Sequence, residues 1–281
     1  MRSDPCPRSY LFVPGNRPER FDKALASGAD AVIVDLEDAV PPDQKDAARA
    51  LVGAWLSAAR PVVVRINAVD TAWFRADVAL CRQAGVAAVM LAKSERVEDL
   101  AEIGNGLPLI PLIESAPGFD NLRAIAAAQN VQRLAFGAID FQLDLNMRAN
   151  FEELLFFRSQ FVLGSKLANL AAPIDSPSTA IDDLAEVEAE AQRARRLGFG
   201  AKLCIHPKQV GAVNASFSPS AAELAWAQRV IAIAATSQGA AVALDGKMVD
   251  KPVMLRAQAI LREQRLPSAD SHQRQDIGLR F

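Results

Sequence analysis

Eight short apolar runs alternate with stretches of helical periodicity along residues 10–205, and this rhythm constrains the fold more than any other feature. The runs are YLFV (10–13), AVIVDL (31–36), VVVRI (62–66), AAVML (87–91), LIPLI (109–113), LAFGA (134–138), APID (172–175) and KLCI (202–205). Strands that are apolar on both faces, each followed by a helix, are typical of a parallel sheet covered by helices. Eight such units predict an α/β fold of the closed (β/α)₈ type, a TIM barrel. An open doubly wound sheet is the alternative, but no GxGxxG follows the first run.

The pattern changes from about residue 219 onward. A helical stretch, a short element AVALDGKMVD and a second helical stretch PVMLRAQAILREQ follow. Two extra helices with an acidic turn between them predict an appended lid or an oligomer contact. We therefore expect a TIM-barrel catalytic domain over residues 1–235, a C-terminal helical lid or oligomerisation segment over 236–266, and a polar, flexible tail over 267–281.

Composition argues against several classes of protein. The chain has 31 Lys and Arg against 33 Asp and Glu, and the net charge of −2 gives no attraction to nucleic acid or to an anionic membrane. No apolar stretch approaches the ~18–20 residues that span a bilayer, and the N-terminal residues lack the apolar core of a signal peptide. Three widely spaced cysteines without a CxxC pair favour a reduced, cytoplasmic protein. Only two histidines occur, which excludes a multi-histidine metal site.

Functional side chains of a parallel barrel project from the carboxyl ends of its strands. Charged or polar residues follow almost every apolar run of this chain. They are Arg17, Asp35, Glu37, Asp38, Arg65, Asn67, Lys93, Glu114, Asp140, Asp175 and His206. A solvated rim would also be polar, so each position has to be weighed by its chemistry. His206 could serve as a base, but a histidine before proline at a strand end is often a structural hydrogen-bonding group.

Glu114 and Asp140 each follow an apolar run and lie 26 residues apart, the length of one strand–helix–strand unit. On neighbouring parallel strands, both carboxylates would emerge at the same edge of the sheet. Mg²⁺ prefers a few oxygen ligands and keeps several waters for a substrate to displace, so this pair is a candidate Mg²⁺ site. The small residues of IESAPG and FGAID favour this, because they allow close approach to the backbone. The alternative is a pair of rim carboxylates neutralised by Arg or Lys.

Arg65 ends the otherwise apolar run VVVRI, and a buried guanidinium needs a carboxylate partner. The partner could be internal, Asp35 or Glu37, or a bound carboxylic acid, for which arginine offers a bidentate fork. Both arrangements can hold together, with Arg65 bridging the two. The acidic cluster Asp35, Glu37 and Asp38 could hold metal-bound water or orient Arg65 and Lys93. Helix capping and local ion pairing is the alternative for this cluster.

Taken together, these strings resemble the citrate lyase beta-subunit-like family of Mg²⁺-dependent aldolases and CoA-ester lyases, which includes malyl-CoA and citramalyl-CoA lyases. The resemblance runs from about residue 8 to 262. It is carried by SYLFVPGNRPERFDKALASGADAVIVDLEDAVPPDQK, RIN, IPLIESAPG, LAFGAID, IDSPSTAIDDL, LCIHPKQ and DGKMVDKP. The resemblance implies a TIM barrel that assembles as a homotrimer, or as a hexamer of two trimers.

The resemblance also implies roles for individual residues. Glu114 and Asp140 match the family's Mg²⁺ ligands, and Glu114 then also faces the substrate. Arg65 matches the arginine that binds the carboxylate and carbonyl region of the oxo acid and stabilises charge in the reaction. Arg17 lies in the NRPERF segment near the substrate.

Four further acidic positions gain a role from the resemblance. Asp35, Glu37 and Asp38 match an acidic strip behind the metal. Asp250, by itself an ordinary residue of a C-terminal turn, matches an aspartate that reaches a neighbouring subunit's site as acid and base. The sequence departs from the family pattern at Ile139, where an acidic residue is common, and in the FQLDLNM segment that follows. This departure bears on substrate preference.

The activity implied by the resemblance is reversible, Mg²⁺-dependent carbon–carbon cleavage of a 3-hydroxyacyl-CoA thioester such as malyl-CoA or citramalyl-CoA. The products would be acetyl-CoA and a small 2-oxo acid: oxaloacetate, pyruvate or glyoxylate. One alternative is a citrate lyase beta subunit that converts citryl-acyl carrier protein to oxaloacetate. A pyruvate-dependent aldolase without CoA is disfavoured by Asp250 and by the lack of an early histidine base. A non-catalytic oligomer that binds Mg²⁺ and an oxo acid is the alternative from another class.

Overall fold

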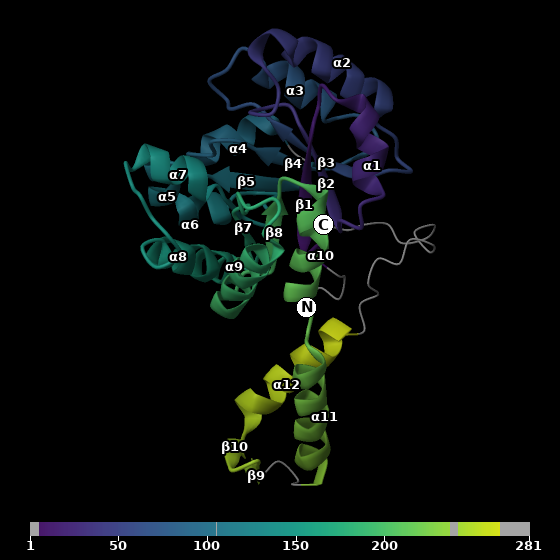
Figure 1. Ribbon diagram of the computed structural model, residues 1–281. Coiled ribbons are helices and arrows are strands. Elements are labelled where there is room, and N and C mark those ends of the chain that lie inside the picture. Colours follow the sequence, from purple (N-terminus) through teal and green to yellow (C-terminus); the bar gives the residue numbers. More distant parts are fainter. Residues whose placement is uncertain (1–5, 105, 237–240, 265–281) are drawn as a thin grey trace.

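Eight parallel strands close into a barrel in the computed structural model, which describes residues 6–104, 106–236 and 241–264 (Figure 1). Neighbours pair in chain order, and β8 closes the barrel on β1. The strands are β1 (Ser9–Pro14), β2 (Ala31–Asp35), β3 (Val62–Ile66), β4 (Val86–Leu91), β5 (Leu109–Ile113), β6 (Ala135–Phe136), β7 (Ile174–Asp175) and β8 (Ala201–Cys204). The predicted (β/α)₈ barrel is confirmed, and every predicted apolar run overlaps a strand.

Helices surround the barrel, and the larger ones follow the helical stretches of the sequence. They are η1 (Pro18–Arg20), α1 (Phe21–Leu25), η2 (Pro42–Gln44), α2 (Lys45–Trp55), α3 (Phe74–Leu80), α4 (Val97–Ile103), α5 (Ala116–Asp120), α6 (Leu122–Ala126), α7 (Ala138–Asp144), α8 (Leu155–Leu167), α9 (Leu184–Leu197) and α10 (Pro207–Ser216). Helix α9 shows how their ends are set. Asp183 accepts the Glu186 N–H at its start, and Gly198 ends it in the left-handed region at φ 112°.

Side chains of each strand alternate between two buried layers. The inner layer fills the barrel with residues such as Ile33, Val63, Leu112, Ala135 and Ile174. The larger outer layer lies between the strands and the helices. Because the alternation has a period of two, the residue two positions after the last inner residue of a strand again faces the barrel axis. This rule decides which polar residues enter the site.

The last elements form a C-terminal arm, made of α11 (Ala221–Thr236), β9 (Val242–Leu244), β10 (Lys247–Val249) and α12 (Lys251–Gln264). Figure 1 shows the arm projecting from the barrel, with the antiparallel β9–β10 hairpin at its far end. The arm has its own apolar core, which includes Val230 of α11 and Ile260 of α12.

The arm's packing bears on the expected domain boundary after residue 235. Because α11 packs on α12, we propose that the second unit starts with α11. The tail expected over 267–281 lies outside the described residues. Within the described part of the chain, no helix combines the length and the apolar character needed to cross a bilayer.

Two phenylalanines of α8 test the packing of the outer layer. Phe161 is fully buried, with its ring 4.7 Å from that of Phe136, whereas Phe156 is 62% exposed. We predict that Phe161→Ala lowers the free energy of unfolding by about 3–5 kcal/mol, because it leaves a cavity. Phe156→Ala, the matched control, should lose less than about 1 kcal/mol. Urea unfolding measures both, and equal losses would contradict this description of the layer.

Candidate active site at the carboxyl ends of the strands

The innermost apolar layer of the barrel is capped by a polar layer. Each residue of this layer lies two positions after an inner apolar residue of its strand. The pairs are Ile33 and Asp35, Val63 and Arg65, Leu112 and Glu114, and Ala135 and Gly137. Asp35, Arg65 and Glu114 are all buried. Strand alternation therefore directs these three charged groups toward one another at the carboxyl end of the barrel.

Arg65 is held by the acidic cluster that follows β2. Its Nε and Nη2 donate to the two carboxylate oxygens of Asp35 at 2.7 and 2.6 Å, and Nη1 lies 3.2 Å from Glu37 and 3.7 Å from Asp38. The guanidinium also stacks over the ring of Phe12 at 4.7 Å. Burial opposes its charge, but these carboxylates outweigh burial and raise the pKa of Arg65. Both internal partners suggested by the sequence, Asp35 and Glu37, are thus present.

Lys93 connects this cluster to Glu114. Its Nζ donates to Glu37 at 2.8 Å, and its backbone N–H donates to Glu114 Oε1 at 2.8 Å. Lys93 has φ of 49°, a left-handed conformation that is uncommon for a residue with a side chain. Such strain is retained where it serves a purpose. Here the turn points an N–H at a buried carboxylate.

Glu114 is the most perturbed carboxyl of the site. It is 3% exposed, and burial raises its pKa to about 8, against the lowering effect of the Lys93 N–H. Glu37 and Asp140 raise this pKa further, while Arg65 lowers it. The side chain lies over Gly137, where a Cβ would come within 2.5 Å of Glu114 Oε2. The glycine of FGAID therefore makes room for this carboxylate.

A hollow of about 60 Å³ brings the central residues together. Its lining includes Arg65, Glu114, Asp140 and the exposed Ile139. Among the described residues, no group of three or more His, Cys, Asp or Glu is arranged to hold a metal. A two-carboxylate site nonetheless suits Mg²⁺, which keeps several waters. The raised pKa of Glu114 also marks a buried carboxyl that a cation would favour in its charged form.

Two residues predicted for the site lie apart from this hollow. Arg17 is exposed at the turn before η1 and pairs with Glu19 at 2.9 Å. Asp250 joins β10 to α12, and Figure 1 shows this junction at the end of the arm remote from the barrel. Its Oδ1 accepts the Val253 N–H at 3.2 Å, which caps α12. A single chain therefore does not bring Asp250 to Glu114.

Asp175, one of the polar residues that follow the apolar runs, lies outside the hollow. It faces the outer layer, where Arg158 donates to it at 3.0 Å and Lys202 at 3.1 Å. Burial works against its charge, but the two cations keep the pKa of Asp175 below its usual value. It follows the inner residue Ile174 directly, so the period of two places it on the opposite face.

Ser176 is the residue that the sequence reasoning missed. It stands two positions after Ile174, lines the hollow, and its Oγ accepts the Ala138 N–H at 3.2 Å. Its place follows from strand alternation once Ile174 is known to face the barrel axis. His206 instead caps α10, where its Nδ1 accepts the Lys208 N–H at 3.2 Å.

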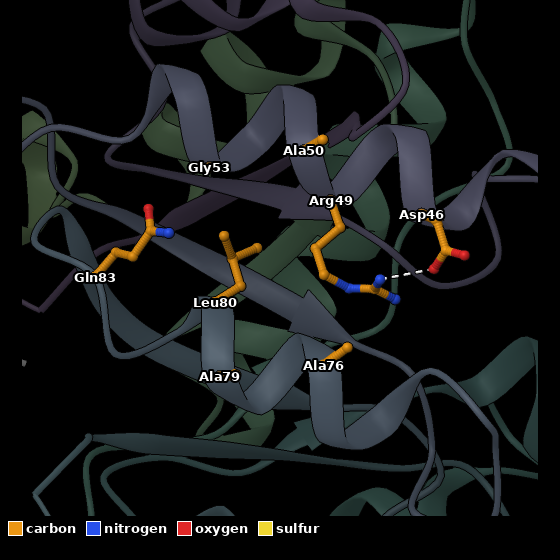
Figure 2. Close-up of a pocket in the computed structure, with 8 residues that line it drawn as sticks. All are labelled: Asp46, Arg49, Ala50, Gly53, Ala76, Ala79, Leu80 and Gln83. Atoms are coloured by element: carbon orange, nitrogen blue, oxygen red, sulfur yellow. Dashed lines mark hydrogen bonds and ion pairs between the residues drawn. The ribbon is translucent and has the colours of Figure 1, made fainter.

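A larger hollow, of about 480 Å³, lies away from the strand ends between α2 and α3 (Figure 2). Small residues such as Gly53 and Ala79 form much of its lining. Its one arginine, Arg49, is paired with Asp46 and Asp77, each at 2.7 Å. With its charges internally paired, this groove offers no catalytic constellation.

Comparison with known proteins gives the strand-end site its family. The sequence profile of the HpcH/HpaI aldolase/citrate lyase family matches residues 8–207, which contain Arg65, Glu114 and Asp140. The chain belongs to this family. The predicted resemblance to citrate lyase beta-subunit-like proteins is therefore confirmed.

Relatives in this family cover almost the whole chain. A citrate lyase subunit beta-like protein of Deinococcus radiodurans is 35% identical, over 90% of this chain and 96% of that protein. A (3S)-malyl-CoA thioesterase of Cereibacter sphaeroides is also 35% identical, over 90% and 93%. A crystal structure of CitE from Mycobacterium tuberculosis with magnesium, acetoacetate and coenzyme A has a TM-score of 0.84 at 36% identity, covering 91% of this chain and 97% of that one. Magnesium in that structure agrees with the predicted Mg²⁺ requirement of the family.

Gly137 provides a test of the carboxylate geometry. We predict that Gly137→Ala lowers Mg²⁺ affinity at least tenfold, because the new Cβ displaces the Glu114 carboxylate. Gly211→Ala is the matched control, since that glycine lies in α10 with no atom near its missing Cβ, and the variant should bind normally. Calorimetric titration with MgCl₂ measures both. Unchanged affinity in Gly137→Ala would show that Glu114 is not a ligand.

The raised pKa of Glu114 predicts a proton linkage. Below its pKa of about 8 the metal-free carboxyl is mostly protonated, and a metal ligand must be ionised. Mg²⁺ binding at neutral pH should therefore release close to one proton, and affinity should rise as pH increases toward 8. Release should fade by about pH 9.5, where Glu114 is already ionised. Calorimetry in buffers of different ionisation enthalpy measures the release, and its absence at neutral pH would contradict the role.

Proposed function

We propose that this protein is a Mg²⁺-dependent carbon–carbon lyase that reversibly cleaves a 3-hydroxyacyl-CoA thioester, such as malyl-CoA or citramalyl-CoA. The products are acetyl-CoA and a small 2-oxo acid. The observation that carries the proposal is the hollow shared by Glu114, Asp140 and a fixed Arg65 at the carboxyl end of the barrel. Membership of an aldolase and citrate lyase family supports this chemistry. The CitE structure with magnesium, acetoacetate and coenzyme A supports the ligand classes.

Glu114 and Asp140 are the residues that would hold Mg²⁺. When bound, the ion supplies Lewis-acid polarisation of the oxygens on the oxo-acid portion. The hydroxyl of the substrate would give its proton to the Asp250 carboxylate of a second subunit, the acid–base group described below, and would become the carbonyl of the 2-oxo acid. The carbon–carbon bond breaks, and its electron pair passes to the thioester enolate.

Arg65 faces the negative charge that develops in this step. Asp35 and Glu37 hold its guanidinium in place before the substrate arrives, so the positive charge needs no reorganisation during the reaction. Stacking on the ring of Phe12 further fixes the plane of the guanidinium. Arg65 is thus a preorganised electrostatic group, and the acidic cluster of Asp35, Glu37 and Asp38 acts through it.

Asp250 of a second subunit is proposed to protonate the enolate, giving acetyl-CoA, and to remove that proton in the reverse direction. This requires a second subunit, and the proposed assembly is a homotrimer or a hexamer of two trimers, with the arm acting as a lid. Exposed apolar residues support such a contact on both sides. They are Met248 and Leu255 on the arm, Leu143 on α7, and Phe156, Leu163 and Leu167 on α8 of the barrel.

A panel of thioesters tests the proposed function. Malyl-CoA, citramalyl-CoA and citryl-acyl carrier protein are incubated with and without Mg²⁺, and glyoxylate, pyruvate and oxaloacetate are quantified. We expect Mg²⁺-dependent 2-oxo acid from a CoA ester. If only citryl-acyl carrier protein is cleaved, and oxaloacetate is the product, the result would favour a citrate lyase beta subunit, which is the name of one relative. Release of CoA with intact malate would favour thioester hydrolysis, the activity in another relative's name. Binding without turnover would leave a non-catalytic Mg²⁺ and oxo-acid binder.

The role of Asp250 is tested by Asp250→Asn. We expect turnover to fall by about 10²–10⁴-fold, since the amide cannot exchange the proton. Binding of Mg²⁺ and of pyruvate should be unchanged, and α12 should stay folded because asparagine also caps helices. Asp245→Asn, in the turn of the neighbouring β9–β10 hairpin, is the control: this exposed residue pairs with Arg229, and its variant should keep full turnover. Full turnover in Asp250→Asn, or lost Mg²⁺ binding, would contradict the assignment.

A further inference from the structure

Ser176 occupies a position in the barrel that is equivalent to those of the charged site residues. The inner apolar residue of β7 is Ile174, and Ser176 stands two residues beyond it. Glu114 has the same relation to Leu112 on β5, and Arg65 to Val63 on β3. Ser176 is only 2% exposed, and it lines the same hollow of about 60 Å³. A serine is thus buried within the polar layer of the site.

The hydroxyl of Ser176 has an unused hydrogen-bonding capacity. Its oxygen accepts the Ala138 N–H at 3.2 Å. A hydroxyl can accept and still donate its own proton. Among the described residues, no acceptor takes a hydrogen bond from the Ser176 hydroxyl within ordinary geometry. A buried donor of this kind is usually paired, and here it lies beside a hollow that can admit a ligand.

The other polar groups that line the hollow either accept hydrogen bonds or are already paired. Glu114 and Asp140 offer acceptors when ionised. Arg65 already uses Nε and Nη2 on Asp35, and its Nη1 faces Glu37. The apolar part of the lining includes Leu112 and Leu203. A carboxylate oxygen that enters this hollow would therefore meet the Ser176 hydroxyl as an uncommitted donor.

The size of the hollow limits what Ser176 can contact. Sites for whole drug-sized ligands measure about 300–1,000 Å³, whereas this hollow measures about 60 Å³. It suits the small acid portion of a substrate and not a nucleotide-bearing thioester. The group opposite Ser176 is then a carboxylate or carbonyl oxygen of that acid.

We propose that Ser176 is a substrate-positioning residue whose hydroxyl donates a hydrogen bond to the carboxylate of the small 2-oxo acid. This inference rests on the proposed function of the same site. The hydrogen bond fixes the rotation of the acid in the hollow, with its reacting carbon toward Arg65. Because the acceptor is charged, the bond is of the stronger, charge-assisted kind.

A purely structural role for Ser176 makes a different prediction. The Ala138 N–H belongs to the segment that carries Asp140, so Ser176 could act only by positioning that carboxylate. In that case, loss of the hydroxyl would weaken Mg²⁺ binding even without an oxo acid. Under the proposed role, loss of the hydroxyl instead leaves Mg²⁺ affinity unchanged and lowers the affinity for the oxo acid.

Two calorimetric titrations of Ser176→Ala separate these roles. The first measures Mg²⁺ alone, and the second measures pyruvate, glyoxylate and oxaloacetate at saturating Mg²⁺. Ser178→Ala is the matched control, because Ser178 is equally buried two residues on, and its hydroxyl accepts the Ala180 N–H in its own loop. We expect Ser176→Ala to bind Mg²⁺ within twofold of the wild type and to lose roughly 10- to 100-fold in affinity for the preferred oxo acid. Ser178→Ala should bind both normally.

The outcomes are distinguishable. Wild-type oxo-acid affinity in Ser176→Ala overturns the inference, and so does a matching loss of Mg²⁺ affinity. If the wild-type protein binds none of the three acids at saturating Mg²⁺, the proposed function fails, independently of Ser176. Should Ser176→Ala fold poorly by thermal unfolding, Ser176→Gly removes the same hydroxyl and is judged by the same criteria.

Discussion

The burial of the Glu114 carboxyl is the constraint on which the rest of the site depends. A carboxylate taken out of water is strongly disfavoured unless charges or donors compensate for it. Gly137 leaves space for this carboxyl, and burial raises its pKa to about 8, because the one N–H from the strained turn at Lys93 compensates only in part. The site is therefore short of positive charge at this oxygen pair. A divalent cation supplies that charge, and a second carboxylate, Asp140, lines the same hollow.

Arg65 does not supply this missing positive charge, because its own charge is already paired with Asp35 and Glu37. Its bidentate contact with Asp35 and its proximity to Glu37 keep the guanidinium in one orientation. Removing one partner of such a buried pair typically destabilises a protein by about 3–5 kcal/mol. The acidic cluster after β2 is thus part of the fold's stability as well as of the site. This double role accounts for the two buried acidic residues at this strand end, Asp35 and Glu37.

The sequence predicted the barrel because eight apolar runs, each with a helical stretch behind it, allow few other folds. It also identified Arg65, Glu114 and Asp140 as strand-end groups, and the structure places these residues on one hollow. It did not show whether Asp175 faces the barrel axis, because an apolar run does not by itself show which of two adjacent residues faces inward. The pairing of Asp175 with Arg158 and Lys202 depends on α8 and β8, which are distant in sequence. Ser176 was missed for the same reason.

The C-terminal arm shows a second limit of prediction from the sequence. Its helices were predicted, but α11 packs with α12 through contacts that local periodicity does not reveal. Asp250 directly follows β10 of the hairpin at the far end of this arm, so its proposed role depends on a second chain.

Crystals grown in Mn²⁺ in place of Mg²⁺ test whether Glu114 and Asp140 together hold a divalent cation. Anomalous scattering locates the manganese without reference to the protein atoms. We predict one strong peak within bonding distance of a carboxylate oxygen from each of Glu114 and Asp140. A peak bound by other residues, or no peak in this hollow at saturating Mn²⁺, would contradict it.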